Sequence, residues 1–373
     1  MKPSLKAGII AAIVMVGIGG AAFPAFSAAL HEPFPLSVQA KSIPAPEKTP
    51  DCGTPPAPLV RLSTVSKYRQ DDPTRSIIDK AGEAKFRKDI APMEDFLSQT
   101  VRYANRYALS GGQKISEAQC ALAWLDNWAA GGALTQVHND KSYNTIGKYI
   151  GGMALAYLQV REAPGLDAKS KRRVEEWLAQ RAEDLAAFHD RTPSTRSSLN
   201  NHRYWSGLGV ASAGVAANRR DLLDWGMEAA RIGLRQIEED GTLPLELARK
   251  DRARDYHLYA LTPLVMLAEL GKANGVDLYA ENGGALKRLA ALVLKTTDDP
   301  TFFERKTGVK QLDYPDASTR ASRMIWLEPY NARFPDDRAT RLLKPIRPLT
   351  SKFIGGRLSE IYGQNPNHDS NNM

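Results

Sequence analysis

Two short segments of the sequence gather side chains that could do chemistry. Residues 200–205 (NNHRYW) combine two amides, an imidazole, a guanidinium and two aromatic rings, and residues 249–257 contain Arg249 and Tyr256. No acidic pair accompanies the first segment, which suits the handling of an anionic sugar better than the hydrolysis of a neutral one. This interpretation requires the two segments to meet in space.

The first segment also has a structural interpretation. Asn200 or Asn201 could cap a helix that begins here, and His202 could be a polar residue with satisfied hydrogen bonds. Tyr204 and Trp205 favour the functional interpretation, because a sugar-binding surface needs aromatic rings beside polar donors. Either ring could nevertheless belong to the core.

In the second segment, Arg249 and Tyr256 lie seven residues apart. Seven residues are two turns of a continuous helix, so the two side chains could share a face. If Arg249 and His202 are buried beside Tyr256, they favour the phenolate; we therefore expect the pKa of Tyr256 to lie below the usual ~10, which would make it a usable base. The alternative is that the basic run is a solvated helix face.

The sequence lacks the motifs of several other enzyme classes. It contains no zinc-protease helix motif, no glycine-rich phosphate loop followed by Lys-Ser or Lys-Thr, and no nucleophile elbow. Asp240 and Glu246 are candidate glycosidase carboxylates, but no pattern places them on one sugar, and Asp240-Gly241 is more simply a turn. We expect neither a metal nor a cofactor.

The N-terminus has the pattern of a secretory signal peptide over residues 1–29. A short basic start is followed by an apolar run over 7–22 and by small residues at 25–29, where we expect cleavage. A membrane anchor is the alternative, although three glycines weaken the apolar run. Because no other stretch approaches the roughly 18 apolar residues of a spanning helix, we expect an exported protein without stable membrane insertion.

The formal net charge is +8, and removal of the signal peptide with Lys2 and Lys6 leaves +6. A basic surface favours encounter with polyanions. For an exported protein we expect an acidic polysaccharide rather than nucleic acid. A basic surface that serves solubility alone is the other possibility.

Helical periodicity dominates the rest of the chain, which we expect to be all-α. Apolar residues recur three or four apart, and glycine or proline breakers separate the patterns by short connections. Short connections place consecutive helices antiparallel, so the pattern predicts helical hairpins arranged as an α/α toroid around a cleft. The predicted helices span residues 85–109, 116–130, 144–161, 168–190, 200–217, 221–239, 252–273, 285–294 and 322–332.

These helices would form one domain over residues 61–362, with an extension at each end. Residues 30–60 are rich in proline and predict an extended arm. Residues 363–373 are almost free of apolar side chains and predict a disordered tail. Cys52 and Cys120 could join the arm to a helix by a disulfide, since oxidation is permitted in an exported chain; two free thiols are the alternative.

The segments 200–205, 243–249 (LPLELAR), 256–257 and 263–269 resemble the periplasmic alginate lyases of polysaccharide lyase family 5. The similarity extends from residues 66–68 and 120–124 to near Tyr362. It implies an incomplete α/α toroid with a deep cleft and a periplasmic location. It further implies the catalytic set Asn201, His202, Arg249 and Tyr256.

The same resemblance implies that Lys67 and Tyr68 belong to a loop that covers the substrate. One departure from the family pattern occurs at Tyr149, where a tryptophan is expected. We expect Lys67 and Lys148 to bind carboxylates of neighbouring sugar units. Aromatic rings that could stack on sugar faces are Tyr68, Tyr149, Tyr204 and Trp205.

The expected reaction is β-elimination from 1,4-linked mannuronate. In β-D-mannuronate the C5 proton and the departing O4 lie on the same side of the ring, so Tyr256 alone could remove one proton and deliver the other. In α-L-guluronate they lie on opposite faces, and His202 would be the second group. A set centred on one tyrosine therefore favours mannuronate-rich alginate.

Two rival functions remain at this stage. A non-catalytic component of an alginate export complex would have the same basic cleft without turnover, and export machinery is a possible partner. A hydrolase of a neutral glycan would depend on a carboxylate pair. We expect a lyase, because neither rival gives Arg249 and Tyr256 a task. We also expect a monomer.

Overall fold

The computed structural model describes residues 29–35, 50–314 and 316–363. The predicted signal peptide up to residue 28, residues 36–49 of the predicted arm and the tail after residue 363 lie outside the described residues. None of the described helices is both long enough and apolar enough to cross a membrane.

Eight longer helices build the body of the protein, and their N-termini show why they begin where they do. The side chains of Asp79, Asn139, Asp167 and Asn200 each accept a hydrogen bond from a backbone N–H of the helix that follows, which satisfies a donor left free at a helix start. The eight helices are α1 (Lys80–Ala108), α2 (Ile115–Ala130), α3 (Asp140–Val160), α4 (Ala168–Arg191), α5 (Asn201–Ala216), α6 (Arg220–Gln236), α8 (Ala253–Ala273) and α9 (Glu281–Thr296).

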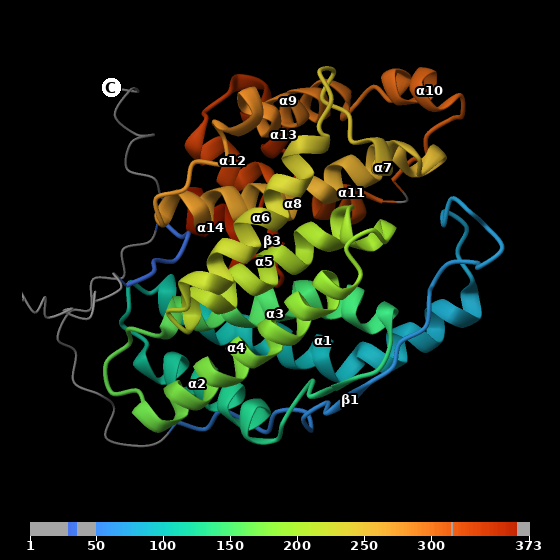
Figure 1. The fold of residues 1–373 in the computed structure, drawn as a ribbon. Coiled ribbons are helices and arrows are strands. Elements are labelled where there is room, and N and C mark those ends of the chain that lie inside the picture. Colours follow the sequence, from blue (N-terminus) through green and yellow to red (C-terminus); the bar gives the residue numbers. More distant parts are fainter. Residues whose placement is uncertain (1–28, 36–49, 315, 364–373) are drawn as a thin grey trace, which may run out of the picture.

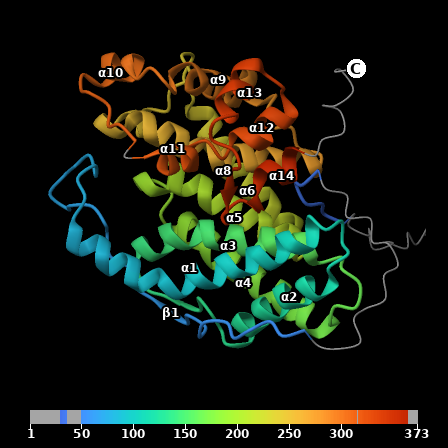
Figure 2. The ribbon, with the colours of Figure 1, turned by 180° about the vertical axis from the view of Figure 1, so that it is seen from behind.

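These helices form hairpins in two rows. Helices α1, α3, α5 and α8 pack side by side in an inner row, and α2, α4, α6 and α9 pack against one another outside them. Figures 1 and 2 show α1 to α4 in one half of the body, α8 and α9 in the other, and α5 between the halves. The predicted α/α toroid is confirmed.

Shorter elements complete the chain, and several of them escaped the sequence analysis. The predicted helix 322–332 is two helices, α11 (Ala317–Arg323) and α12 (Leu327–Arg333), which pack on α8. The remaining short elements are α7 (Pro244–Leu247), α10 (Thr301–Thr307), α13 (Asp337–Leu343), α14 (Leu358–Gly363), the 3-10 turns Arg196–Ser198 and Lys250–Arg252, a parallel pair β1 (Arg61–Leu62) and β2 (Gln136–Val137), and an antiparallel pair β3 (Thr350–Ser351) and β4 (Gly356–Arg357).

The close crossing of α3 and α5 fixes the centre of the inner row. A Cβ at Gly209 would lie 2.4 Å from the carbonyl oxygen of Gly147, so this crossing needs a glycine. Because the two backbones approach so closely, the beginning of α5 is held against α3. The residues 200–205 thereby come to lie beside Lys148.

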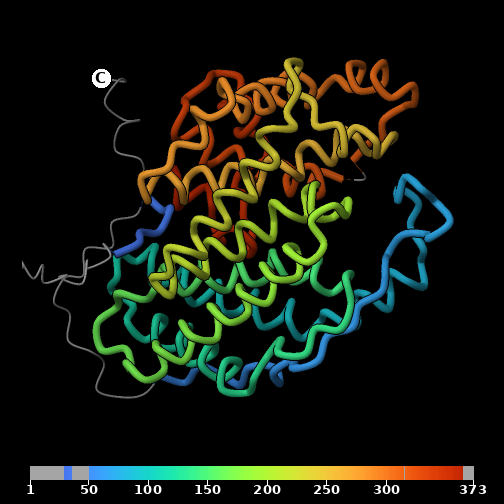
Figure 3. Tube along the Cα trace, in the orientation of Figure 1, coloured from blue at the N-terminus to red at the C-terminus, as the bar shows by residue number. Residues whose placement is uncertain are grey.

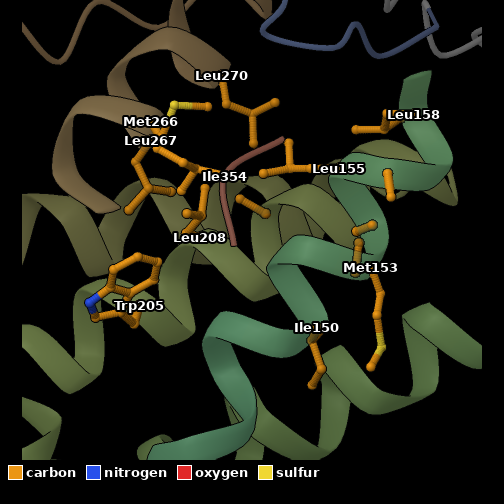
Figure 4. Close-up of a cluster of buried hydrophobic side chains, with 14 of the residues drawn as sticks. Ile150, Met153, Leu155, Leu158, Trp205, Leu208, Met266, Leu267, Leu270 and Ile354 are labelled. Carbon is orange, nitrogen blue, oxygen red and sulfur yellow. The ribbon is translucent and has the colours of Figure 1, made fainter. Parts of the chain in front are cut away.

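The β3–β4 hairpin lies between α8 and α1. Strand β4 packs on α1, and the hairpin inserts Ile354 into the core. Figure 4 shows Ile354 among Leu155 of α3, Leu208 of α5 and Met266 of α8, all of which are buried. The hairpin thus anchors the C-terminal part of the chain to the inner row by apolar packing.

Residues 52–56 of the N-terminal arm lie over α1 and α2. A disulfide joins Cys52 to Cys120 of α2. The carbonyl oxygen of Cys52 accepts hydrogen bonds from Tyr103 Oη (2.6 Å) and Trp124 Nε1 (2.9 Å), and that of Pro56 accepts one from Trp128 Nε1 (2.9 Å). The arm is therefore attached by a covalent bond as well as by indole and phenol donors.

Replacement of both cysteines by serine should lower the free energy of unfolding. The disulfide closes a loop with a sequence separation of 68 residues, and constraining a loop of this length in the unfolded chain is worth about 4 kcal/mol. Denaturant unfolding of the C52S/C120S variant measures the effect. Reduced wild-type protein is the control and should match the variant; an unchanged midpoint would contradict the expectation.

Candidate active site

Two adjoining cavities form a cleft along the inner row. The smaller, of about 300 Å³, contains Tyr256 and is called the Tyr256 cavity; the larger, of about 780 Å³, contains Lys352 and is called the Lys352 cavity. They share a wall formed by Lys148, Trp205, Tyr259 and Arg323. The cleft is thus long enough to involve α3, α5, α8, α11 and the β3–β4 hairpin.

The Tyr256 cavity brings together both segments found in the sequence. The predicted catalytic residues Asn201, His202, Arg249 and Tyr256 all line it. So do four of the six predicted substrate-binding residues, which are Lys67, Tyr68, Lys148 and Trp205.

The beginning of α5 supplies the amide and the imidazole. His202 Nδ1 lies 3.3 Å from the carbonyl oxygen of Asn144; because a carbonyl can only accept, Nδ1 carries the proton and Nε2 remains an acceptor. Burial lowers the pKa of His202 to about 4, opposed by the Asn144 carbonyl and assisted by the charges of Arg249, Lys141 and Lys148. His202 is therefore a neutral base or acceptor near pH 7.

The neighbouring Asn201 is 1% exposed and is held by Glu246 of α7. Glu246 Oε1 accepts from the Asn201 backbone N–H (2.9 Å) and from its Nδ2 (2.9 Å), and Oε2 lies 3.1 Å from the same Nδ2. From the sequence, Glu246 is a candidate only for a hydrolase carboxylate. Instead, the structure makes it a hydrogen-bond partner of Asn201.

Arg249 connects Tyr256 to the loop that precedes α1. Its Nη2 donates to Tyr256 Oη (2.8 Å) and to the carbonyl oxygen of Arg75 (2.5 Å), and its guanidinium carbon lies 3.8 Å from the centre of the Tyr256 ring. The hydroxyls of Tyr68 and Tyr256 are 3.1 Å apart. Figure 3 shows this loop projecting at the N-terminal end of α1, on the side of the body that carries α7 and α10.

The expected low pKa of Tyr256 is wrong for this structure. Burial raises the pKa of Tyr256 well above its usual range, and a negative charge on Tyr68 would act in the same direction, whereas Arg249 acts against them. His202 adds no positive charge because it is neutral. The more acidic phenol of the pair is Tyr68: burial raises its pKa, but Lys67, the hydrogen bond with Tyr256, Arg252 and Arg249 together lower it.

Two predicted sugar-stacking rings do not line either cavity. Tyr149 is fully buried, and its hydroxyl donates to Glu94 of α1; Tyr204 is 1% exposed and faces α6, where Gly233 leaves room for its ring. Successive residues of a helix point about 100° apart, so the cleft receives Lys148 rather than Tyr149. The substrate-binding prediction for these two tyrosines is therefore contradicted.

The charged lining of the cleft has one sign. Every charged residue among the described residues that line either cavity is a lysine or an arginine. Tyr259, Phe353 and most of these cations could not be found from the sequence, because they come from separate elements and form no motif. The basic residues are Lys67, Arg75, Arg102, Arg106, Lys141, Lys148, Arg249, Arg323, Lys352 and Arg357.

A cleft lined by cations and aromatic rings fits an acidic polysaccharide, and known proteins share both sequence and fold with this chain. Residues 45–303 match the family described as alginate lyase. The chain belongs to the alginate lyase family. The family implies a polysaccharide substrate.

Relatives named alginate lyase match most of this chain. One from Azotobacter vinelandii is 36% identical over 322 residues, which are 84% of this chain and 85% of the relative. One from Cobetia marina is 34% identical over 342 residues, which are 87% of each chain.

Solved structures show the same fold. Alginate lyase A1-III from Sphingomonas species A1 superposes with a TM-score of 0.74 at 23% identity, covering 90% of this chain and 97% of that one. A variant of A1-III complexed with a tetrasaccharide gives a TM-score of 0.75 at 22% identity, with the same coverage. At this identity the likeness supports the α/α toroid.

Within the described part of the chain, no three His, Cys, Asp or Glu side chains are gathered so that they could hold a metal ion. Two carboxylates that contact residues of the cavity lining are already engaged. Glu246 is bound to Asn201, and Asp255 pairs with Arg323.

Lys148 should give the reaction an alkaline limit. Burial lowers its pKa to about 8; Glu94 opposes this, while Lys67, Lys352 and Arg323 assist it. Above that pH the neutral amine no longer attracts a sugar carboxylate, so we expect kcat/KM on alginate to fall by up to about tenfold per pH unit. The measurement is initial rate against pH at low substrate concentration.

The K148R variant is the matched control for this titration. A guanidinium keeps its charge to about pH 12, so the alkaline decline should disappear. The same decline in both proteins would assign it to another group and contradict the role of Lys148.

Proposed function

We propose that this chain cleaves 1,4-linked β-D-mannuronate polymers by β-elimination, leaving a 4,5-unsaturated uronate at the new non-reducing end. The observation that carries the proposal is the contact between Arg249 and the Tyr256 hydroxyl in a cavity whose charged lining is entirely basic. A lyase acting on a polyanion needs both features. A hydrolase would need a pair of carboxylates, and none is among the described lining residues.

The first task in elimination is to stabilise charge on the uronate carboxylate. The C5 proton is weakly acidic while the neighbouring carboxylate is fully charged, and it becomes more acidic when donors hold that carboxylate. Asn201 Nδ2 carries two hydrogens, of which one suffices for Glu246 and the other is available to substrate. Arg249 and the N-terminal end of α5 add positive potential at the same place.

The second task is proton transfer. In mannuronate the C5 proton and O4 share one side of the ring, so Tyr256 as phenolate removes the C5 proton and then delivers a proton to the departing O4. The electron pair of the C5–H bond forms the C4–C5 double bond as the C4–O4 bond breaks. Tyr256 is regenerated as phenolate, and no water is consumed.

The pairing of Tyr256 with Tyr68 supports formation of this phenolate despite burial. The positive charges of Lys67, Arg252 and Arg249 favour loss of one proton from the pair at Tyr68. Across the 3.1 Å hydrogen bond the remaining proton can pass to Tyr68, which leaves the phenolate on Tyr256. His202, neutral at the start of α5, is then free to accept a hydrogen bond through Nε2.

The polymer extends from the Tyr256 cavity into the Lys352 cavity. Lys148 and Arg323 lie in the shared wall, and Lys352 and Arg357 lie beyond it, so successive carboxylates meet successive cations. Trp205 also belongs to the shared wall and offers a ring face to a sugar. A tetrasaccharide in a solved relative is consistent with a cleft for several sugar units.

Replacement of Tyr256 by Phe should abolish turnover while leaving binding and folding intact. Loss of the base and acid should lower kcat by at least about 10³-fold, because removal of the C5 proton and protonation of O4 both pass through this hydroxyl. Ultraviolet absorbance of the unsaturated product measures turnover on polymannuronate, polyguluronate and a neutral glucan. Titration calorimetry with polymannuronate measures binding.

Tyr107→Phe is the matched control, because the Tyr107 hydroxyl is buried, lacks a hydrogen-bond partner among the described residues and lines neither cavity. It should turn over like the wild type. Full activity of Tyr256→Phe would overturn the proposed role. If the wild-type protein binds polymannuronate without any rise in absorbance, the result favours the non-catalytic export component instead. Turnover of polyguluronate by the wild-type protein would give His202 the role of a second base.

We also propose that the protein works in the periplasm. The support is the signal-peptide pattern of residues 1–29 and the disulfide between Cys52 and Cys120, a bond that persists in oxidising compartments. Cell fractionation followed by N-terminal mass analysis should find a chain that begins after residues 25–29 in the periplasmic fraction. An uncleaved chain in the cytoplasm would contradict this location.

A further inference from the structure

Glu246 is a buried carboxylate that the proposed reaction does not use directly. It is 1% exposed and is absent from the lining of both cavities. Burial raises its pKa, opposed by its hydrogen bonds from Asn201 and by the charge of Arg249. A buried carboxylate is costly unless hydrogen bonds and charges compensate it, so its partners indicate what it does.

Those partners belong to one residue of the active site. The carboxylate accepts from the backbone N–H of Asn201 and, through both oxygens, from the Asn201 side-chain amide. A carboxylate oxygen can only accept, so the amide must turn its nitrogen toward Glu246. The contact therefore fixes the amide about its last torsion, a torsion that is otherwise broad in asparagine.

The contact with Glu246 leaves the amide oxygen without a partner among the described residues. Asn201 Oδ1 is buried and has no hydrogen-bond partner among the described residues, while Asn201 lines the Tyr256 cavity. An unpartnered buried oxygen beside a cavity calls for a donor from a ligand or from water. Glu246 thus holds Asn201 in an orientation that the protein itself leaves incomplete.

The backbone that follows Glu246 also sets the position of Arg249. The carbonyl oxygen of Glu246 accepts from the Arg249 backbone N–H at 3.0 Å. The Glu246 side chain reaches back to α5, and the Arg249 side chain reaches forward to Tyr256 of α8. One short segment after α6 therefore spaces the amide and the guanidinium that act on the same sugar.

We propose that Glu246 is a positioning residue, which holds the Asn201 amide so that Nδ2 keeps one N–H for the uronate carboxylate and Oδ1 stays free to accept from a sugar hydroxyl or water. This inference rests on the proposed elimination only for its activity readout. Glu246 acts by holding Asn201 and does not itself contact the substrate. A loss caused by removing Glu246 should consequently depend on whether Asn201 is present.

The test is a double-mutant cycle of Glu246→Met and Asn201→Ala. Methionine keeps the length of the side chain and removes the acceptors, so E246M should lower kcat/KM on polymannuronate about 10- to 100-fold, as loss of an orienting partner commonly does. In the N201A background the same change should cost less than about twofold, because only the backbone N–H of residue 201 still binds Glu246 and no amide remains to be oriented. The loss should fall on kcat more than on KM.

Glu246→Gln is the matched rescue variant. In the wild type Oε1 alone accepts from both the backbone and the side chain of Asn201, and glutamine keeps that one oxygen. E246Q should therefore recover most of the activity that E246M loses. Equal losses from E246M in both backgrounds, or a Gln variant as impaired as the Met variant, would overturn the inference.

Two further measurements keep the outcome decisive. If circular dichroism shows that E246M does not fold, Glu246→Asp, which withdraws the carboxylate by one methylene, replaces it in the same cycle with the same criteria. If wild-type protein yields no unsaturated product from either polyuronate, the proposed function fails, and the cycle is measured as Kd for polymannuronate. Additive changes in Kd would then overturn the Glu246 inference independently.

Discussion

The site depends on one guanidinium that is shared by three parts of the chain. Arg249 follows α7, donates to the Tyr256 hydroxyl of α8 and at the same time binds the carbonyl oxygen of Arg75 in the loop before α1. The position of that loop over the cleft and the environment of Tyr256 are therefore coupled. Because Arg249 is 6% exposed, both bonds form where water competes little and are correspondingly strong.

The second constraint is charge. The described lining of the cleft is basic and includes no acidic residue, so its cations repel one another when no ligand is bound. Carboxylates placed just outside the lining offset part of this repulsion. Glu246 lies behind Asn201, Asp255 pairs with Arg323, and Glu94 pairs with Lys352. These partners orient donors and cations toward the cleft while leaving its surface to an anionic polymer.

Several features could be read from the sequence because they are local. Periodicity and breakers located the long helices within a few residues, and the hairpin arrangement followed from short connections. The segments 200–205 and 249–257, with their resemblance to a known family, identified residues that the structure gathers in one cavity. The short helices α10, α13 and α14 carried too weak a period to be found.

What the tertiary structure alone decided concerns direction and environment. Helical spacing could not show that Tyr149 and Tyr204 turn away from the cleft, because the face of a helix that meets a cavity is set by its neighbours. Nor could helical spacing show that burial raises the pKa of Tyr256 by more than the charge of Arg249 lowers it, since a pKa depends on solvent exclusion as well as on charge. The sequence by itself determined which residues could react. Packing decided which of them face the cleft and which protons they carry.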